Sequence, residues 1–326
     1  MLSYKQIIDK IDQLEEANVL MAALELGIYS VLEKKWMTAR AVSGKAGTSR
    51  EGTAALLNAL AAMGALRKRG DRFANTSETY KHLCASSPHY KKGTVMLRRD
   101  NRDEWAALLN VIRNGRDLSQ YESGDDAEFR NFFTYAMHER SEAYAGKVAR
   151  IVARRRVGRM LDLGGGPGSY SAAVLRKDDQ ASAIVLDRKP AIRVASKIHQ
   201  ETGIFRRLDF IAGDLFLTDY GKSYDTVFYS NILHIYNPAE NRKLFRKIHK
   251  ALNPGGRFII ADLFLKDNLL EPYDAALFSL TMLLFTKTGK TYTFTETEKL
   301  LRGTGFGAFK RFKLDAGSSL IEAVKK

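Results

Sequence analysis

Carboxylates and glycines gather where three apolar runs of this chain end. The turn Asp162-Leu163-Gly164-Gly165-Gly166-Pro167-Gly168 follows the first run, Asp187 closes the second, and Gly213-Asp214-Leu215-Phe216 follows the third. A dinucleotide fingerprint needs G-x-G-x-x-G/A, but Ser169 stands at its third glycine position, and Asp162 would repel a pyrophosphate. Three carboxylates without a phosphate-pairing lysine therefore favour a positively charged nucleoside as the ligand.

Each part of such a nucleoside has a matching side chain. Asp162 suits an ammonium group, and Asp187 can accept hydrogen bonds from both ribose hydroxyls. Asp214 can accept a hydrogen bond from an adenine amino group while Leu215 or Phe216 packs on the ring. The glycines permit a positive φ and a close approach of backbone and ligand.

A parallel sheet is needed to bring these residues together. Short apolar runs in the second half of the chain alternate with helical stretches or loops, at residues 160–163, 183–186, 210–212, 226–229 and 258–261. Two last strands, residues 308–314 and 319–324, are joined by Asp315-Ala316-Gly317, which is too short for a helical crossover. The sequence predicts an α/β fold with a doubly wound sheet and an antiparallel edge hairpin.

The first half of the chain is predicted to be mostly helical. Apolar residues recur at helical spacing over residues 4–32, with an end or bend at Gly27, and further helices are expected at residues 38–42, 50–66, 103–113 and 126–157. Thr48-Ser49 forms an N-cap, and two short strands flank Arg69-Gly70-Asp71. Two short helices and a basic hairpin describe a winged helix, but the helix at residues 50–66 offers few base-reading side chains.

Composition excludes several classes of protein. The chain has 326 residues, a net charge of +15 and a single cysteine, Cys84, so it is not a disulfide-stapled secreted module. No secretion signal or membrane-spanning run is visible, and we expect a cytoplasmic protein. Basic clusters, among them Arg246-Lys247, are expected on solvated helix faces, because no aromatic residues alternate with them as nucleic-acid binding would need.

The combined order of motifs resembles class I S-adenosylmethionine-dependent methyltransferases, specifically the dimeric small-molecule O-methyltransferases of the caffeic acid and hydroxyindole type. The shared segments are Phe133-Thr134-Tyr135-Ala136-Met137, the glycine turn, Gly213-Asp214-Leu215-Phe216, Asn231-Ile232-Leu233-His234, Leu252-Asn253-Pro254-Gly255-Gly256-Arg257 and Gly303-Thr304-Gly305-Phe306.

The resemblance implies a winged-helix dimerisation domain at residues 1–100, linking helices at 101–157 that line the acceptor pocket, and a cofactor domain at 158–326. It implies a homodimer, a Rossmann-like methyltransferase sheet, and S-adenosylmethionine converted to S-adenosylhomocysteine without a metal. The implied cofactor residues are Asp162, Gly164, Gly166, Gly168, Asp187, Gly213, Asp214, Leu215, Phe216, Ser230 and Asn231.

His234 stands where this family places its catalytic base, just past the fourth strand. The chain departs from the plant-type pattern at two points, since Ile235-Tyr236 replaces Asp-Trp and Thr291 replaces a Glu that orients the imidazole. Asp262, at the end of the fifth strand, and Asp274 are the possible substitutes for that Glu. The other histidines are expected to be solvated (His82, His89, His199 and His249) or to be a packed or exposed helix residue (His138).

The acceptor pocket is predicted from aromatic and thioether side chains at helical spacing. Its members are Phe133, Met137, Phe278, Met282 and Phe285. Such a lining favours a flat, largely apolar acceptor, most simply a hydroxylated aromatic compound.

Other functions stay open at the level of sequence. The same fold can methylate carbon or nitrogen, and the charge of +11 on residues 151–326 admits an RNA or protein methyltransferase. A winged-helix regulator that senses S-adenosylmethionine, or a catalytically silent binding protein, is the alternative outside the enzymes. We expect no membrane partner, and nucleic-acid binding is disfavoured by the helix at residues 50–66.

Overall fold

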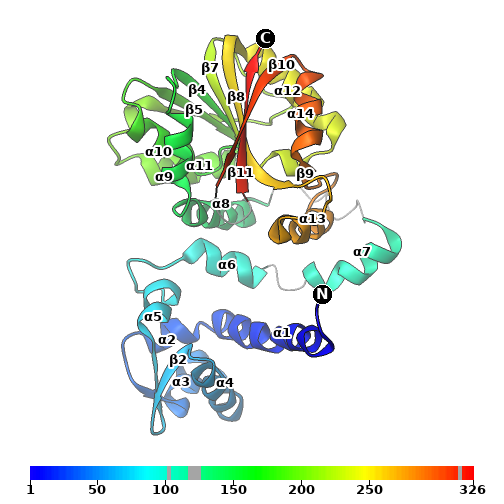
Figure 1. Cartoon of the computed structure of the whole chain (residues 1–326). Helices are drawn as coiled ribbons and strands as arrows, with labels where there is room; N and C mark the ends of the chain where they lie inside the picture. Colours follow the sequence, from blue (N-terminus) through cyan, green and yellow to red (C-terminus); the bar gives the residue numbers. More distant parts are fainter. Residues whose placement is uncertain (101–103, 117–125, 315–317) are drawn as a thin grey trace. The chain divides into compact units, whose positions relative to one another are not determined.

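The computed structural model describes residues 1–100, 104–116, 126–314 and 318–326 (Figure 1). The chain divides into two compact units, Met1–Asp103 and Glu104–Lys326. None of the helices in the described ranges is long and apolar enough to cross a membrane.

The N-terminal unit combines helices with a small antiparallel sheet. Its elements are α1 (Tyr4–Glu25), α2 (Ile28–Leu32), β1 (Met37–Thr38), α3 (Ala39–Ala46), α4 (Arg50–Ala62), β2 (Leu66–Arg69), β3 (Arg72–Asn75), α5 (Ser77–Leu83) and α6 (Lys92–Asp100). Gly27 separates α1 from α2 with a φ of 64°, and Ser49 caps α4, both as predicted. The helix expected at residues 50–66 ends at Ala62 because Leu66 already pairs with Asn75 in the predicted β2–β3 hairpin. The pairing of β1 with β3 was not predicted.

The C-terminal unit is built on one large mixed sheet. Its strands are β4 (Arg159–Leu163), β5 (Ser182–Asp187), β6 (Leu208–Ala212), β7 (Tyr224–Ser230), β8 (Leu252–Leu265), β9 (Tyr292–Thr293), β10 (Phe306–Lys313) and β11 (Ser318–Lys325). The order is β10-β11-β8-β7-β4-β5-β6, and β9 pairs with β8. The chain runs outward from β4 to β5 and β6 and then returns to the other side of β4 as β7, so the sheet is doubly wound as predicted.

The predicted edge hairpin is also present. Strands β10 and β11 pair antiparallel, and β11 pairs antiparallel with β8. Its expected turn, residues 315–317, lies outside the described residues.

Helices cover both faces of this sheet, as Figure 1 shows. Those packed on its faces are α9 (Ala145–Val152), α10 (Ser169–Lys177), α11 (Lys189–His199), α12 (Pro238–Ala251) and α14 (Phe294–Arg302). The unit also contains α7 (Leu108–Asn114), α8 (Ala127–Ser141) and α13 (Tyr273–Phe285), with short 3-10 turns η1 (Glu104–Ala107), η3 (Phe205–Arg207) and η4 (Leu233–Ile235).

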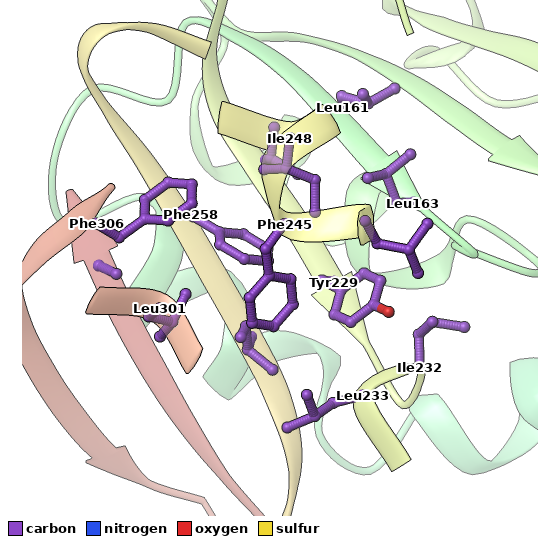
Figure 2. Packing of buried hydrophobic residues seen from close by; sticks show 14 of the residues in the cluster. Leu161, Leu163, Tyr229, Ile232, Leu233, Phe245, Ile248, Phe258, Leu301 and Phe306 are labelled. Atoms are coloured by element: carbon purple, nitrogen blue, oxygen red, sulfur yellow. The ribbon is translucent and has the colours of Figure 1, made fainter. Parts of the chain in front are cut away.

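Successive side chains of a strand point to opposite faces of the sheet. Leu161 and Leu163 join the buried cluster that holds Phe245 of α12 and Leu301 of α14 (Figure 2). Met160, which precedes Leu161 and points to the opposite face, joins the cluster formed with α9 and α10. Both faces are therefore apolar, which explains the continuous apolar runs in the sequence.

The prediction of a single helix at residues 126–157 is wrong. It is broken into α8 and α9 by a turn in which Tyr144 N donates to Ser141 O. The break lets Val148 and Val152 of α9 face the sheet, where both are fully buried. The chain leaves helical structure before Gly158, whose φ of 62° starts the approach to β4. The helix expected at residues 103–113 begins with the 3-10 turn η1.

Candidate active site

Loops from the carboxyl ends of the parallel strands are joined by backbone hydrogen bonds. Gly164 N donates to Leu186 O at 2.8 Å, and Gly213 N donates to Asp187 O at 2.9 Å. On the other side of β4, Asn231 N donates to Ala261 O at 2.9 Å. The sequence-predicted residues that follow β4 to β8 thus lie along one edge of the sheet.

Asp162 is buried beneath the glycine turn, with only 1% of its surface exposed. Ser171 Oγ donates to its Oδ2 at 2.5 Å, whereas its Oδ1 has no hydrogen-bond partner among the described residues. Burial raises the pKa of this carboxyl to about 7, an effect that the Ser171 hydrogen bond opposes and the nearby Asp187 reinforces. A buried carboxylate oxygen without a donor is suited to an ammonium group of a ligand.

The glycine turn itself is tightly shaped. Gly164, Gly166 and Gly168 all have a positive φ, and Gly168 begins α10. A Cβ at Gly165 would stand 2.6 Å from the carboxyl carbon of Asp162. The turn therefore leaves no room for a side chain between its backbone and Asp162.

Asp187 is oriented by two backbone amides. Gly166 N donates to its Oδ2 at 2.7 Å, and Arg188 N donates to its Oδ1 at 2.6 Å. Each oxygen keeps a second lone pair, which is the arrangement that two ribose hydroxyls require.

Asp214 makes contacts that the sequence did not predict. Its Oδ1 accepts from Phe216 N at 2.8 Å and Leu217 N at 3.2 Å, and its Oδ2 lies 3.0 Å from Arg188 Nη2. Asp214 thus shapes its own loop, and Leu215 and Phe216 follow it as expected.

Lys247 of α12 binds the backbone of the loop that contains Asp214. Its Nζ donates to the carbonyl oxygens of Leu215, Phe216 and Thr218 at 3.0, 2.7 and 2.9 Å. The expectation that Arg246-Lys247 is a solvated cluster is wrong for Lys247, which is half-buried. Residue type and helical position gave no signal of this role.

His234 lies in η4 with 8% of its surface exposed. Its Nδ1 is 2.6 Å from Asp262 Oδ1, and Leu263 N donates to that same oxygen at 2.7 Å. Of the two acidic candidates for orienting His234, Asp262 makes the contact, whereas Asp274 is exposed in the first turn of α13. Thr291, at the position of the family's Glu, is buried, and its hydroxyl has no partner in the described part of the chain.

The backbone around His234 is held by Asn241, which is fully buried on α12. Its Nδ2 lies 2.9 Å from both Leu233 O and Tyr236 O, and its Oδ1 accepts from Tyr229 OH at 3.0 Å. Asparagine within an amphipathic helix suggests a solvated position, so the sequence gave no indication of this role. The preceding residues Ser230, buried at the end of β7, and Asn231, exposed with a φ of 57°, start the same turn.

The predicted acceptor residues fall on two helices of this unit. On α13, the ring of Phe278 meets the His234 ring edge to face, with centroids 4.8 Å apart. Met282 is buried one turn later, and Phe285 is half-buried. On α8, Phe133 stacks on Phe129, and Met137 is half-buried. The structure therefore brings one of the five, Phe278, into contact with His234.

Two other histidines hold the glycine turn. His199 Nε2 donates to Pro167 O at 2.8 Å, and His138 Nδ1 lies 2.7 Å from Ser169 Oγ. The expectation that His199 is solvated is wrong, because it is buried against this turn and burial lowers its pKa. His138 is a packed helix residue.

Comparison with known proteins identifies the family. Residues 105–307 match the O-methyltransferase domain, and residues 10–87 match the O-methyltransferase dimerisation domain. The chain belongs to the O-methyltransferase family. It is a methyltransferase, and its methyl donor is S-adenosylmethionine, as the sequence analysis expected.

Individual O-methyltransferases and a related enzyme align over most of the chain. It is 28% identical to 3-hydroxy-5-methyl-1-naphthoate 3-O-methyltransferase of Streptomyces sahachiroi, over 95% of this chain and 92% of that protein. It is 28% identical to the N,N-dimethyltransferase OxyT of Streptomyces rimosus, over 76% of this chain and 75% of that protein. The structure of an O-methyltransferase family protein from Burkholderia thailandensis superposes with a TM-score of 0.88 at 25% identity, covering 100% of this chain and 99% of that chain.

Proposed function

We propose that this O-methyltransferase methylates a hydroxyl group of a flat, largely apolar aromatic acceptor, with His234 as the general base. The contact between His234 Nδ1 and Asp262 Oδ1 carries this proposal. The naphthoate 3-O-methyltransferase of Streptomyces sahachiroi supports the choice of a hydroxylated aromatic compound. Phe278, which packs at right angles to His234, supports an aromatic acceptor beside the base.

The residues at the strand ends fit S-adenosylmethionine. The buried Oδ1 of Asp162, which has no hydrogen-bond partner among the described residues, suits the ammonium of its amino acid part, and the second lone pair of each Asp187 oxygen suits its ribose. Backbone of Gly164, Gly166, Gly168 and Gly213 borders the nucleoside, with Asp214, Leu215 and Phe216 at its adenine end and Ser230 and Asn231 on the side of β7. When bound, the cofactor supplies a methyl group on a positively charged sulfur.

His234 is arranged to accept a proton at Nε2. The carboxylate oxygen Oδ1 of Asp262, which accepts from Leu263 N, also accepts a hydrogen bond from Nδ1, so Nδ1 carries the hydrogen and Nε2 keeps its lone pair. The imidazole takes the hydroxyl proton while the acceptor oxygen forms its bond to the methyl carbon and the carbon–sulfur bond breaks. Asp262 stabilises the imidazolium that results, and Phe278, Met282, Phe285, Phe133 and Met137 hold the acceptor in line.

We assign residues 1–100 to dimerisation, residues 101–157 to linking helices that contribute to the acceptor pocket, and residues 158–326 to the cofactor domain. The match of residues 10–87 to a dimerisation domain supports a homodimer. Helix α1 supports it as well, since Ile7, Ile11 and Leu14 are 45%, 60% and 62% exposed at helical spacing.

N-methylation is the second candidate, because OxyT is an N,N-dimethyltransferase and is as similar in identity as the naphthoate enzyme. A neutral amine needs no base before attack, so the His234–Asp262 pair favours a hydroxyl. The test uses isotopically labelled S-adenosylmethionine with hydroxynaphthoates and matched aminonaphthoates, followed by NMR of the products. A label in a methoxy carbon supports the proposal, and a label found only in N-methyl carbons rejects it.

A further inference from the structure

Arg116 connects two parts of the catalytic unit that flank His234. It stands two residues after the end of α7, a helix that packs against α13. Its Nε donates to Leu283 O at 3.2 Å, and its Nη2 donates to Gly289 O at 2.6 Å. One half-buried guanidinium thus joins the last turn of α13 to the turn that follows this helix.

The turn at Gly289, whose carbonyl Arg116 binds, contacts the backbone of His234. Lys290 N donates to His234 O at 3.0 Å, and Gly289 N donates to Thr286 Oγ1 at 3.0 Å. A Cβ at Gly289 would stand 2.2 Å from His234 O and 2.9 Å from Ile235 O. Because these backbones are in direct contact, a shift of Gly289 must also shift η4.

The other carbonyl bound by Arg116 belongs to the helix that carries the aromatic neighbour of His234. Phe278 and Met282 lie on α13, and Leu283 follows Met282 directly. The carbonyls of a last helical turn have no intrahelical donor, so a cation at this end is favourable. The same side chain therefore restrains the acceptor side and the base side of the site.

We propose that Arg116 is a positioning residue for methyl transfer, which fixes the distance between the acceptor-lining face of α13 and the imidazole of His234. This inference rests on the proposed function of His234 as the base. A guanidinium fits the task because it offers several N–H donors in a rigid plane, so two carbonyls in different directions are bound at once. A lysine ammonium on a flexible stem does not hold the two carbonyls at a fixed angle.

The experiment compares Arg116→Ala and Arg116→Lys with Arg113→Ala in the full-length dimer. Arg113 is exposed in the last turn of α7, three residues earlier, and serves as the matched control. At saturating cofactor and acceptor, we expect kcat to fall about 10- to 100-fold in Arg116→Ala, since small misplacement of reacting groups has effects of this size. Arg116→Lys should recover only part of this loss, S-adenosylhomocysteine should bind with unchanged Kd, and Arg113→Ala should match the parent enzyme.

Chemical rescue separates positioning from a general loss of structure. Guanidinium chloride at tens of millimolar, far below denaturing concentration, should restore activity of Arg116→Ala at least severalfold, and sodium chloride at the same ionic strength should not. The proposal is overturned if Arg116→Ala keeps the kcat of the parent enzyme. It is also overturned if kcat falls, guanidinium does not restore it, and cofactor binding is weaker.

Amide exchange tests the same inference without activity. Peptides that cover residues 286–292 should exchange about tenfold faster in Arg116→Ala than in the parent, and guanidinium should slow them again. An unchanged amide exchange rate in residues 286–292 overturns the proposal that Arg116 holds this turn, even if the enzyme is active. If the parent enzyme methylates no hydroxylated acceptor, the proposed function fails, and the exchange result still decides whether Arg116 holds this turn.

Discussion

Nδ1 of His234 and Oδ1 of Asp262 lie 2.6 Å apart, although 28 positions separate them in the chain. Parallel pairing of β7 with β8 ends at Ser230 and Ala261, so Asp262, which lies inside β8, stands beside the turn that follows β7. The contact fixes the direction and the tautomer of the imidazole, and in the proposed mechanism this carboxylate from β8 takes the role that the plant-type family gives to a Glu at the position of Thr291.

Asp262→Asn is expected to lower kcat about 100-fold, because the amide carries no charge to stabilise the imidazolium. The Kd of S-adenosylhomocysteine should stay within about twofold, since Asp262 contacts Nδ1 of His234 and is not one of the proposed cofactor residues. Steady-state kinetics and calorimetry measure the two effects. Asp274→Asn is the control, because Asp274 is exposed, and a full kcat in Asp262→Asn would remove Asp262 from the mechanism.

Binding of S-adenosylmethionine should tighten as the pH rises through 7. The pKa of Asp162 is raised to about 7 by burial, so the carboxyl is protonated below that pH and charged above it. An ammonium group favours the charged form, and the affinity should change up to about tenfold per pH unit below the pKa. Calorimetry in buffers of different ionisation enthalpy should detect proton release at pH 6 that disappears near pH 8, and Asp162→Asn should abolish this release. Equal affinity at pH 6 and pH 8 contradicts the assignment.

Gly165→Ala should weaken cofactor binding about tenfold or more while the protein stays folded. The new methyl group would press on the Asp162 carboxyl, which is buried and cannot move into solvent. Gly203→Ala is the matched control, because both glycines lie outside the positive-φ region and a Cβ at Gly203 meets no atom within 4 Å. Equal affinities of the two variants, measured by calorimetry, would show that the space between turn and Asp162 does not matter.

Phe278→Ala should lower kcat/KM for an aromatic acceptor by about tenfold, the usual value of one aromatic contact. The ring of Phe278 supports the His234 imidazole, and its loss leaves a cavity beside the base. Leu277→Ala changes an exposed neighbour on α13 and should have no such effect. If both variants behave alike in steady-state assays, Phe278 does not border the acceptor.

Charges on the exposed face of α1 should convert a dimer to monomers. Ile11→Glu and Leu14→Glu place a carboxylate on apolar surface that is 60% and 62% exposed within one chain. Analytical ultracentrifugation at micromolar concentration should show the change in mass. Gln13→Glu adds the same side chain at an exposed polar position, and its mass should equal that of the parent. A monomeric parent protein would contradict the homodimer.

Features that repeat along the strands were predictable from the sequence. Asp162, Asp187 and Asp262 each stand at or near the end of an apolar run, and parallel strands bring such ends to one edge. The doubly wound sheet and the edge hairpin were predicted from the same runs and from the length of the last turn, whereas the order of the strands was not.

Side chains on helices were predicted less well, because their burial depends on what packs against the helix. Lys247 and His199 were expected to be solvated, yet both bind backbone carbonyls of the loops proposed to hold the cofactor. Asn241 belongs to the same class, with amide bonds to the turn that carries His234. Residues 142–144, which lie between α8 and α9, include no glycine or proline, and the nearby Gly146 lies inside α9.

Single-turnover methyl transfer by His234→Ala tests the central claim most directly. With cofactor and a hydroxylated aromatic acceptor bound at saturation, the rate should fall at least about 100-fold relative to the parent, while the Kd of S-adenosylhomocysteine stays unchanged. A rate equal to that of the parent would contradict the account, since the proton would then leave the acceptor without His234.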